Sequence, residues 1–192
     1  MQSRPFPVHP SLEQYRKQAK DLRKACTSGK PDSIREWVRR WVESYVDQEA
    51  ETQASLRAII LTKRLRESAE LDEIVRVEKI IRESNLAKPA PQVADAQFFV
   101  ARAHGFESWP RFSKHLQALE RRQSPDARFE AAADAIVSGD IRTLEKLLEE
   151  DPGLISARSR RAHNATLLHY VAANGVESFR QKTPLNIPIS LV

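Results

Sequence analysis

The ten residues T-L-L-H-Y-V-A-A-N-G, from Thr166 to Gly175, form the stretch on which the interpretation of the fold depends. Thr166 is suited to begin a helix, because its hydroxyl can accept a hydrogen bond from a free backbone N–H. Apolar residues then recur at helical spacing, at Leu167, Leu168, Val171 and Ala172. Gly175 is suited to end that helix, because glycine adopts the left-handed conformation at little cost. A helix this short is unstable alone in water, so we expect it to pack against other helices.

The pattern resembles the signature of the ankyrin repeat, which opens T-P-L-H-x-A and closes with a glycine. The positions that coincide with the signature are Thr166, Leu168, His169, Ala172 and Gly175. Two positions depart from it, since Leu167 replaces the proline and Val171 replaces the first alanine. In that family the matching histidine makes hydrogen bonds that support the repeat. The resemblance therefore implies a structural role for His169.

Glycine spacing indicates that the pattern repeats. Gly105 and Gly139 are 34 residues apart, and Gly139 and Gly175 are 36 residues apart, close to the ankyrin period of about 33. The apolar offsets after Gly139, at Leu144, Leu147 and Leu148, are the same as those after Gly29, at Ile34, Trp37 and Val38. We therefore predict an all-α fold of stacked helix pairs, an ankyrin-like solenoid.

The sequence predicts two regions. Residues 1–124 form a helical leader region, and residues 125–192 form the ankyrin-like repeat segment. Within the leader, Leu12 to Leu22 and Ala94 to Phe112 resemble a short helical region found ahead of ankyrin repeats in bacterial proteins. This resemblance implies an architecture and no activity, and it does not cover residues 47–90.

Helical periodicity is clear in the leader. We expect helices over residues 12–26, from Ile34 onward, over 94–104 and over 108–122, with one long helix or two joined helices within 49–84. The apolar stripe of the second helix is Ile34, Trp37, Val38, Trp41, Val42 and Tyr45. This spacing favours tryptophans in the core over an exposed stacking platform. Within 49–84 the expected apolar stripes are Leu56, Ile59 and Ile60, and then Leu71, Ile74, Val75 and Ile81.

The last repeat is expected to be incomplete. Pro184 and Pro188 oppose the second helix that would follow Gly175, so the repeat has no polar cap. We expect the apolar residues near the end of the sequence to fold back over the open face, namely Ile187, Ile189, Leu191 and Val192. The alternatives are self-association through this uncapped repeat, or a truncated product of marginal stability.

Some fifteen residues without a helical pattern, from Asp151 to Ala165, precede Thr166. Such a long irregular stretch is unusual in a compact domain, but an ankyrin-like array has a projecting hairpin finger at this position. The basic residues of this finger, together with Tyr170 on the following helix, are the candidate partner-binding residues: Arg158, Arg160, Arg161, His163 and Tyr170. A basic finger suits an acidic protein partner. The alternative is an ordinary solvated loop.

Motifs for catalysis and cofactor binding are absent from the sequence. Neither G-x-x-x-x-G-K-S/T nor G-x-G-x-x-G occurs, and the histidines do not show zinc-ligand spacing. Cys26 is the single cysteine, and no catalytic partner for it can be identified. We therefore expect no enzyme activity, no metal and no cofactor.

The composition limits the cellular compartment and the classes of partner that we expect. With a single cysteine no intrachain disulfide can form, and no window reaches the roughly 18 apolar residues of a membrane span, which favours a cytoplasmic protein without membrane contact. The excess of arginine over lysine hints at a bacterial source. Residues 1–124 hold 23 Lys and Arg against 17 Asp and Glu.

The favoured function is a non-enzymatic protein–protein interaction scaffold. The alternative, less favoured, is nucleic-acid binding through basic upstream helices, including Lys63, Arg64 and Arg66. A third possibility is a fragment without independent function.

Overall fold

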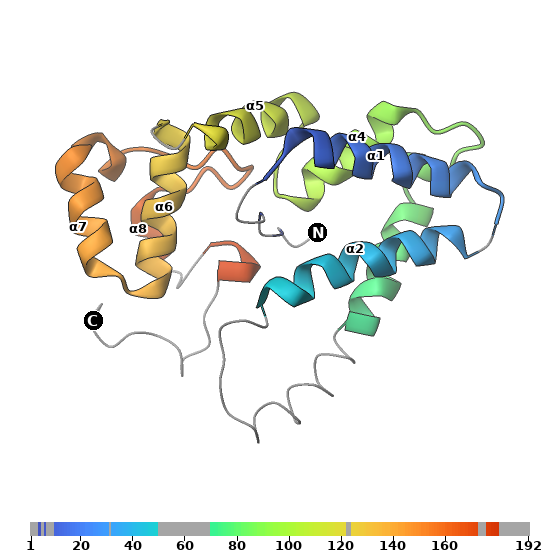
Figure 1. The fold of residues 1–192 in the computed structure, drawn as a ribbon, viewed down its shortest axis with the longest axis horizontal. Helices are drawn as coiled ribbons and strands as arrows, with labels where there is room; N and C mark the ends of the chain where they lie inside the picture. The colour runs from blue at the N-terminus through green and yellow to red at the C-terminus, as the bar shows by residue number, and fades with distance from the viewer. Residues whose placement is uncertain are drawn as a thin grey trace, which may run out of the picture. The chain divides into compact units, whose positions relative to one another are not determined.

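The computed structural model describes Arg4, Phe6 and residues 10–30, 32–49, 70–121, 124–172 and 176–180. The regular structure of these residues is entirely helical, which confirms the all-α prediction (Figure 1). The chain divides into two compact units. One unit is Tyr15–Phe99, and the other, the C-terminal unit, joins Met1–Gln14 to Val100–Val192. The division into a leader of residues 1–124 and a repeat segment of 125–192 rests on sequence pattern and stays a prediction.

The Tyr15–Phe99 unit holds most of helix α1 (Leu12–Thr27) and all of helix α2 (Ser33–Glu49). Helix α1 buries Tyr15, Ala19 and Leu22, which recur at offsets of four and seven and so lie on one face. Gly29 lies between the two helices with a φ of +67°. Helix α2 follows this glycine, as the apolar offsets after Gly29 predicted.

The tryptophans of α2 belong to the core, as the sequence predicted. Trp37 is 6% exposed and Trp41 is 4% exposed, and their ring centroids are 5.4 Å apart. Both rings also contact Phe99 on helix α4 (Val93–Ala103), at centroid distances of 6.4 and 5.9 Å. Because the two indole rings pack against each other and against Phe99, they do not form an exposed stacking platform.

A helix runs through residues 70–82, and the apolar stripe predicted there is partly wrong. Leu71 and Val75 are 60% and 57% exposed, whereas Ile74 and Ile81 are buried as expected. The buried face is completed by Val77 and Glu78, at offsets of three and four from Ile74. The apolar pattern predicted the wrong stripe because the buried face includes the carboxylate of Glu78. The other predicted stripe, Leu56, Ile59 and Ile60, lies outside the described residues.

Glu78 is accommodated on this buried face by two arginines. Its carboxylate lies 2.9 Å from Arg35 Nε on α2 and 2.7 Å from Arg82 Nη2 on its own helix. Burial by itself raises the pKa of Glu78, but hydrogen bonds from Arg82 and Arg35 outweigh it and leave the pKa lowered. The ion pair with Arg35 thereby ties α2 to the helix of residues 70–82.

The remaining leader elements agree with the predicted helices. A short 3-10 helix, η2 (Asn85–Ala87), follows the helix of residues 70–82 and buries Leu86. Helix α4 ends before Gly105, which has a φ of +81°. Helix α5 (Trp109–Glu120) follows, with Ser108 as its N-cap. Its buried residues Phe112, His115 and Leu116 lie on one face.

The C-terminal unit is built around helix α6 (Pro125–Ser138), which begins at the cap residue Ser124. Gly139 ends α6 with a φ of 73°, and its position allows the chain to turn at once into helix α7 (Ile141–Glu150). Asp140 caps α7 by accepting a hydrogen bond from the Thr143 N–H. The helix pair predicted around Gly139 is therefore present.

Helix α6 packs against α5, α7 and helix α8 (Leu167–Ala172). A 3-10 helix, η3 (Pro152–Ile155), contacts α6, α7 and α8, and a second, η4 (Ser178–Arg180), follows later in the chain. The core residues come from α6, η3 and the α8 region: Phe129, Ala132, Ala133, Ile136, Val137, Leu154, Ala165, Leu167 and Tyr170. The leucines of α7 pack against this core while remaining partly exposed.

The signature stretch forms α8, but its predicted apolar stripe is partly wrong, because Leu167 is buried whereas Leu168 and Val171 are 71% and 44% exposed. His169 is exposed and is hydrogen-bonded within the first turn of α8. The Nδ1 atom of His169 accepts a hydrogen bond from the Thr166 N–H at 3.2 Å and lies 2.8 Å from the Thr166 hydroxyl. The hydroxyl predicted as a helix cap therefore bonds a side chain at the start of α8. Gly175 and residues 181–192 lie outside the described residues, as do the expected fold-back and the self-association through the uncapped repeat.

The stretch between α7 and α8 is irregular apart from η3, as expected. It closes into a loop over residues 156–165, in which the Ser159 N–H donates to the Ala165 carbonyl at 2.8 Å. Asn164 has a positive φ of 52°, which allows the chain to reverse direction there. We refer to residues 156–165 as the finger loop.

The corrected burial pattern on the helix of residues 70–82 can be tested with two valines on that helix. Val77 is 1% exposed and Val75 is 57% exposed. Val77→Ala should lower the free energy of unfolding by about 2 kcal/mol, because it removes two buried methyl groups and leaves a cavity. The matched control Val75→Ala should change it by less than about 0.5 kcal/mol. Urea unfolding followed by circular dichroism measures both, and equal effects would contradict the assignment.

Candidate functional site

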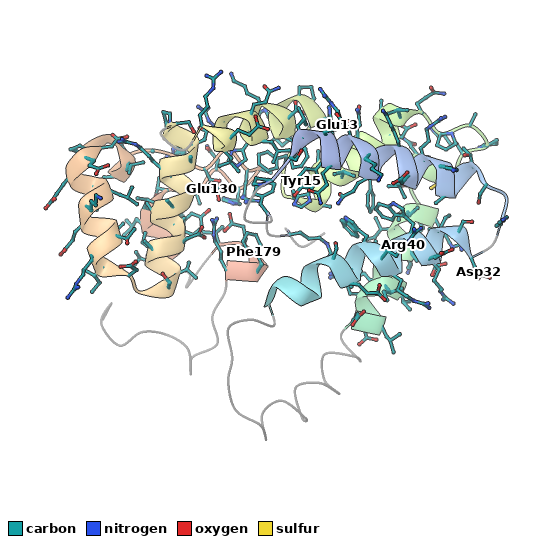
Figure 2. The ribbon with its side chains drawn as sticks, viewed as in Figure 1. Glu13, Tyr15, Asp32, Arg40, Glu130 and Phe179 are labelled. Atoms are coloured by element: carbon teal, nitrogen blue, oxygen red, sulfur yellow. The ribbon has the colours of Figure 1, made fainter. Side chains whose placement is uncertain are left out.

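Four charged side chains are buried together in the C-terminal unit. Glu130 comes from α6, Arg161 from the finger loop, Glu177 from the segment after α8, and Arg180 from η4. Figure 2 labels Glu130 on α6 and Phe179, the neighbour of Arg180, on η4. The side chains of Arg161 and Glu177 are 1% and 0% exposed. We call these four residues the buried charge cluster.

Arg161 uses its whole guanidinium group inside the protein. Its Nη1 donates to the His104 carbonyl at 2.7 Å, its Nη2 donates to Glu130 at 3.5 Å, and its Nε lies 3.2 Å from Glu177 Oε1. The guanidinium carbon also lies 4.8 Å from the ring centroid of Phe6 and 5.5 Å from that of Phe106. Aromatic rings therefore cover the charge that the carboxylates neutralise.

Arg180 joins the cluster to α6 from a different segment. Its Nη2 donates to Glu130 Oε2 at 2.7 Å, its Nε donates to Asp134 at 2.8 Å, and its Nη1 donates to Glu177 at 3.3 Å. Burial raises the pKa of Glu130, but the positive charges of Arg161 and Arg180 outweigh this effect, and the pKa is lowered. The same carboxylates raise the pKa of Arg180 against the opposing effect of burial.

Glu177 collects further hydrogen bonds. Tyr170 donates its hydroxyl to Glu177 Oε1 at 2.7 Å, and His163 Nε2 lies 3.0 Å from the same oxygen. The Ala165 N–H donates to His163 Nδ1, so in a neutral ring Nε2 carries the proton and donates to Glu177. Burial alone would raise the pKa of Glu177, but the hydrogen bond with His163 and the charges of Arg180 and Arg161 lower it to about 2. Burial and the charge of Glu177 raise the pKa of Tyr170.

The structure separates the five residues predicted to bind a partner. Arg158 and Arg160 are exposed on the finger loop, whereas Arg161 and Tyr170 are buried in the core of the unit. The expectation that Arg161 and Tyr170 contact a partner is therefore wrong, because their polar groups are already paired internally. His163 keeps a partly exposed side chain but is hydrogen-bonded to Glu177.

The exposed arginines are held by local contacts. Arg158 Nη1 donates to the Asn164 carbonyl at 3.1 Å, which braces one side of the finger loop against the other. Arg160 Nε donates to Asp126 at the start of α6, also at 3.1 Å, and its side chain stays 66% exposed. Both arginines therefore have defined positions while remaining exposed to solvent.

A cavity of about 550 Å³ lies beside the finger loop. It is lined by α5, the first turn of α6 and the loop itself, through Glu107, Arg111, Lys114, His115, Asp126, Ser159, Arg160, Arg161, Ala162 and Asn164. Its volume is within the range of ligand-binding pockets. The lining residues include four of the basic type against two carboxylates, so the cavity favours anionic groups.

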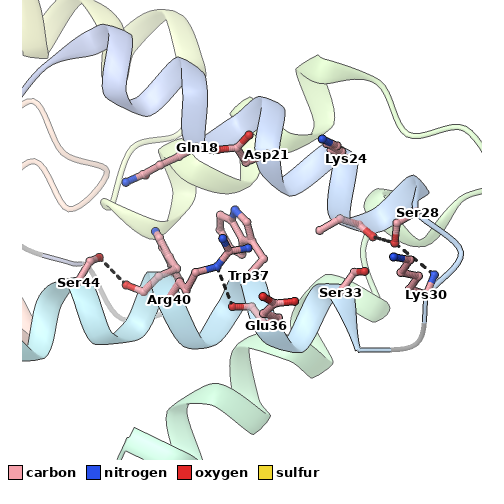
Figure 3. Close-up of a pocket in the computed structure, with 12 residues that line it drawn as sticks. Gln18, Asp21, Lys24, Ser28, Lys30, Ser33, Glu36, Trp37, Arg40 and Ser44 are labelled. Atoms are coloured by element: carbon pink, nitrogen blue, oxygen red, sulfur yellow. Dashed lines mark hydrogen bonds between the residues drawn. The ribbon is translucent and has the colours of Figure 1, made fainter.

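A second cavity, of about 520 Å³, lies between α1 and α2 in the Tyr15–Phe99 unit (Figure 3). Helix α1 contributes Gln18, Asp21 and Lys24, and α2 contributes residues at helical spacing that include Glu36, Trp37 and Arg40. Figure 3 shows these side chains on the facing sides of the two helices. Charges of both signs line this cavity, which gives it no preference for ligand charge.

Sequence reasoning missed most of the buried charge cluster. Glu130 stands within the apolar run from Phe129 to Val137, and a charge at such a position is the one signal that could have identified it. Glu177 and Arg180 follow the signature stretch without a recognisable pattern. The basic residues proposed for nucleic-acid binding, Lys63, Arg64 and Arg66, lie outside the described residues.

Comparisons with protein-family models, with curated proteins and with solved structures give no significant match. Among the described residues, no group of three or more His, Cys, Asp and Glu side chains could hold a metal ion. The helices that the structure describes are also too short or too polar to cross a membrane.

Arg161 should be critical for stability, in contrast to its exposed neighbour in the finger loop. Arg161→Ala leaves Glu130 and Glu177 buried with less compensating charge, so we expect a loss of about 3–5 kcal/mol in the free energy of unfolding. The control Arg158→Ala removes an exposed side chain and should cost less than about 1 kcal/mol. Chemical denaturation of both variants tests this difference, and a small effect at Arg161 would show that the cluster is not needed for folding.

The lowered pKa of Glu177 predicts a stability loss in acid. Its pKa falls from 4.5 to about 2 on folding, so its ionised form contributes about 3 kcal/mol above pH 4.5. That contribution is lost as the pH falls from about 4.5 through 2. Denaturant unfolding across this range should show a steeper loss for the natural protein than for Glu177→Gln, which starts less stable. Equal slopes would contradict the ionised, paired state of Glu177.

Proposed function

We propose that this protein is a non-enzymatic protein-binding scaffold of the ankyrin type, whose finger loop binds an acidic segment of a partner. The observation that carries the proposal is that the arginines of the finger loop differ in burial. Arg161 is buried in the charge cluster, whereas Arg158 and Arg160 remain exposed on the same loop. The loop is thus fixed from inside and presents positive charge outside.

Internal support makes the finger loop a suitable recognition element. The Ser159–Ala165 backbone hydrogen bond, the Arg161 contacts and the His163–Glu177 hydrogen bond all fix its conformation. A loop that is ordered before binding loses less conformational entropy when a partner docks. This preorganisation favours binding over the alternative of an ordinary solvated loop.

The charges around the loop favour an acidic partner. Arg111 and Lys114 on α5 are exposed and line the same cavity as Arg160. Arg111 is paired with Glu107, and Arg160 with Asp126, so the positive excess is modest. Electrostatic complementarity of this size guides association and selects the partner, while affinity also needs apolar contacts from the rest of the interface.

The ankyrin-type assignment rests on local features. Helices α1, α4 and α6 are each followed by a glycine of positive φ and then by a second helix. Thr166 and His169 of the signature stretch are joined by hydrogen bonds at the start of α8, as the resemblance implies. These features support a series of helix pairs. The bacterial source and cytoplasmic location that the composition favours are part of the same proposal.

The proposal can be tested by affinity capture from native lysate of a bacterium with and without nuclease. We expect the protein to retain a partner that survives nuclease treatment and is lost from the variant Arg158→Ala/Arg160→Ala. The matched control, Arg102→Ala/Arg142→Ala, removes two exposed arginines elsewhere and should retain the partner. Arg161 is left intact, because its loss would unfold the loop.

Two results would contradict the proposal. Capture that is equal for both double variants would show that the finger loop is not the binding surface. Capture that disappears with nuclease would support nucleic-acid binding through the basic upstream helices, for which a steep loss of binding with added salt is the further criterion.

A further inference from the structure

The cavity between α1 and α2 has no part in the proposed binding function. It measures about 520 Å³ and belongs to the Tyr15–Phe99 unit, whereas the finger loop belongs to the C-terminal unit. Its volume is within the range of pockets that hold small molecules. The charged side chains that line it are all exposed, namely Asp21, Lys24, Lys30, Glu36 and Arg40 (Figure 3).

The charged groups of this cavity do not neutralise each other. Asp21 and Lys24 are three residues apart on α1, and Glu36 and Arg40 are four residues apart on α2. Opposite charges often pair at these helical spacings. Within the part of the chain that the structure describes, however, none of these lining residues forms an ion pair, and Arg40 Nε instead donates to the Glu36 backbone carbonyl at 3.4 Å. The cavity therefore keeps both signs of charge available to a ligand.

These charges are ordered along the cavity. The chain turns between α1 and α2, and Lys24 and Lys30 lie near this turn (Figure 3). Asp21 and Glu36 lie farther from the turn, on the two facing helices. A helix rises about 4.5 Å from Asp21 to Lys24 and about 9 Å from Asp21 to the end of α1 at Thr27. The acidic and basic regions of the cavity are therefore about 5–9 Å apart.

A further hydrogen-bond acceptor lies beside the two carboxylates. Gln18 precedes Asp21 by three residues and so lies on the same face of α1. Its Oε1 atom is buried and has no hydrogen-bond partner among the described residues, so it lacks a donor. A primary ammonium group has three N–H donors, one for Gln18 Oε1 and one for each carboxylate. An ammonium is therefore the group that this region fits.

The cavity also has an apolar wall. Trp37 and Trp41 line it with stacked indole rings whose centroids are 5.4 Å apart. An alkyl chain can pack against these rings, and an indole attracts a cation placed over its face. Arg40 lies on the far side of Glu36 from the lysines and opposes a bound cation, but the carboxylates of Asp21 and Glu36 outnumber it (Figure 3).

We propose that this cavity binds an ω-amino carboxylate, whose ammonium lies between Asp21 and Glu36 and whose carboxylate is held by Lys24 and Lys30. A chain of about five methylene groups, as in 6-aminohexanoate, separates the two charged groups by roughly 7 Å when extended, which fits the distance between the acidic and basic regions. The methylene groups pack against the indole rings. The inference does not depend on the finger loop or on the proposed partner.

Nuclear magnetic resonance of the full chain with 15N-labelled indole groups tests the site with 6-aminohexanoate as the probe. Trp37 and Trp41 line the cavity, whereas Trp109 lies on α5 in the other unit. The probe should shift the indole signals of Trp37 and Trp41 in a saturable way, with a Kd of about 1 mM or tighter, and leave Trp109 unchanged. Hexanoate and hexylamine each lack one charge and should bind at least about tenfold more weakly. The absence of a saturable shift would overturn the proposal, as would equal binding of either analogue.

A substitution at an exposed position tests the ammonium end without changing the core. Asp21→Asn removes one negative charge and should weaken the binding of 6-aminohexanoate by about tenfold. The matched control Asp32→Asn changes an exposed carboxylate outside the cavity lining (Figure 2) and should leave the Kd unchanged. Circular dichroism checks that both variants are folded. Equal weakening by the two variants would show a general effect of charge and would contradict a site at Asp21.

The carboxylate end can be tested in the same way. Lys24→Gln/Lys30→Gln should weaken 6-aminohexanoate by about tenfold but leave hexylamine binding unchanged, because hexylamine has no carboxylate. The control Lys17→Gln/Lys20→Gln removes two exposed lysines of α1 outside the cavity and should change neither Kd. If the first pair weakens both ligands equally, the lysines do not hold the carboxylate and the proposal fails.

A C-terminal lysine of a polypeptide carries the same ammonium and carboxylate at the same separation as 6-aminohexanoate. A short peptide that ends in lysine therefore distinguishes the source of the ligand, with its C-terminal amide as the control. If the free acid binds and the amide does not, the ligand can be a polypeptide C-terminus. If 6-aminohexanoate binds and neither peptide does, the ligand is a free small molecule, and both results support the site.

Discussion

The C-terminal unit depends on the mutual neutralisation of charges that are removed from water. An isolated buried carboxylate or guanidinium would cost several kcal/mol, so Glu130, Glu177, Arg161 and Arg180 are tolerable only together. These residues come from α6, the finger loop and the segment after α8, which therefore must all be in place at once. The cluster thereby gives an irregular stretch of chain one defined conformation.

This arrangement explains how one loop combines rigidity with recognition. Side chains that point inward from the finger loop satisfy the cluster, and those that point outward keep their charge for solvent or a partner. Arg160 occupies both roles in part, because it is exposed and yet bound to Asp126. Asp126 also faces His115 on α5, so the same carboxylate links the exposed surface to a buried ring.

Much of the fold could be predicted from sequence, because helix periodicity and helix ends are local properties. The spacing of Trp37, Val38 and Trp41 identified a buried face, and Gly139 identified the end of α6. The prediction failed on the helix of residues 70–82, where Glu78 occupies a position on the buried face. Periodicity recognises apolar residues, and it cannot anticipate that Arg35, 43 residues earlier, neutralises a carboxylate there.

The sequence by itself determined the helical class, the places where helices break at glycine, and a basic segment between two helices. The tertiary structure alone decided which of those basic residues are exposed. Arg158, Arg160 and Arg161 are close neighbours of the same chemical type, yet Arg161 is buried because Glu130 and Glu177 converge on it from distant parts of the chain. Burial of a charge depends on partners that are brought together by folding, and local sequence does not contain that information.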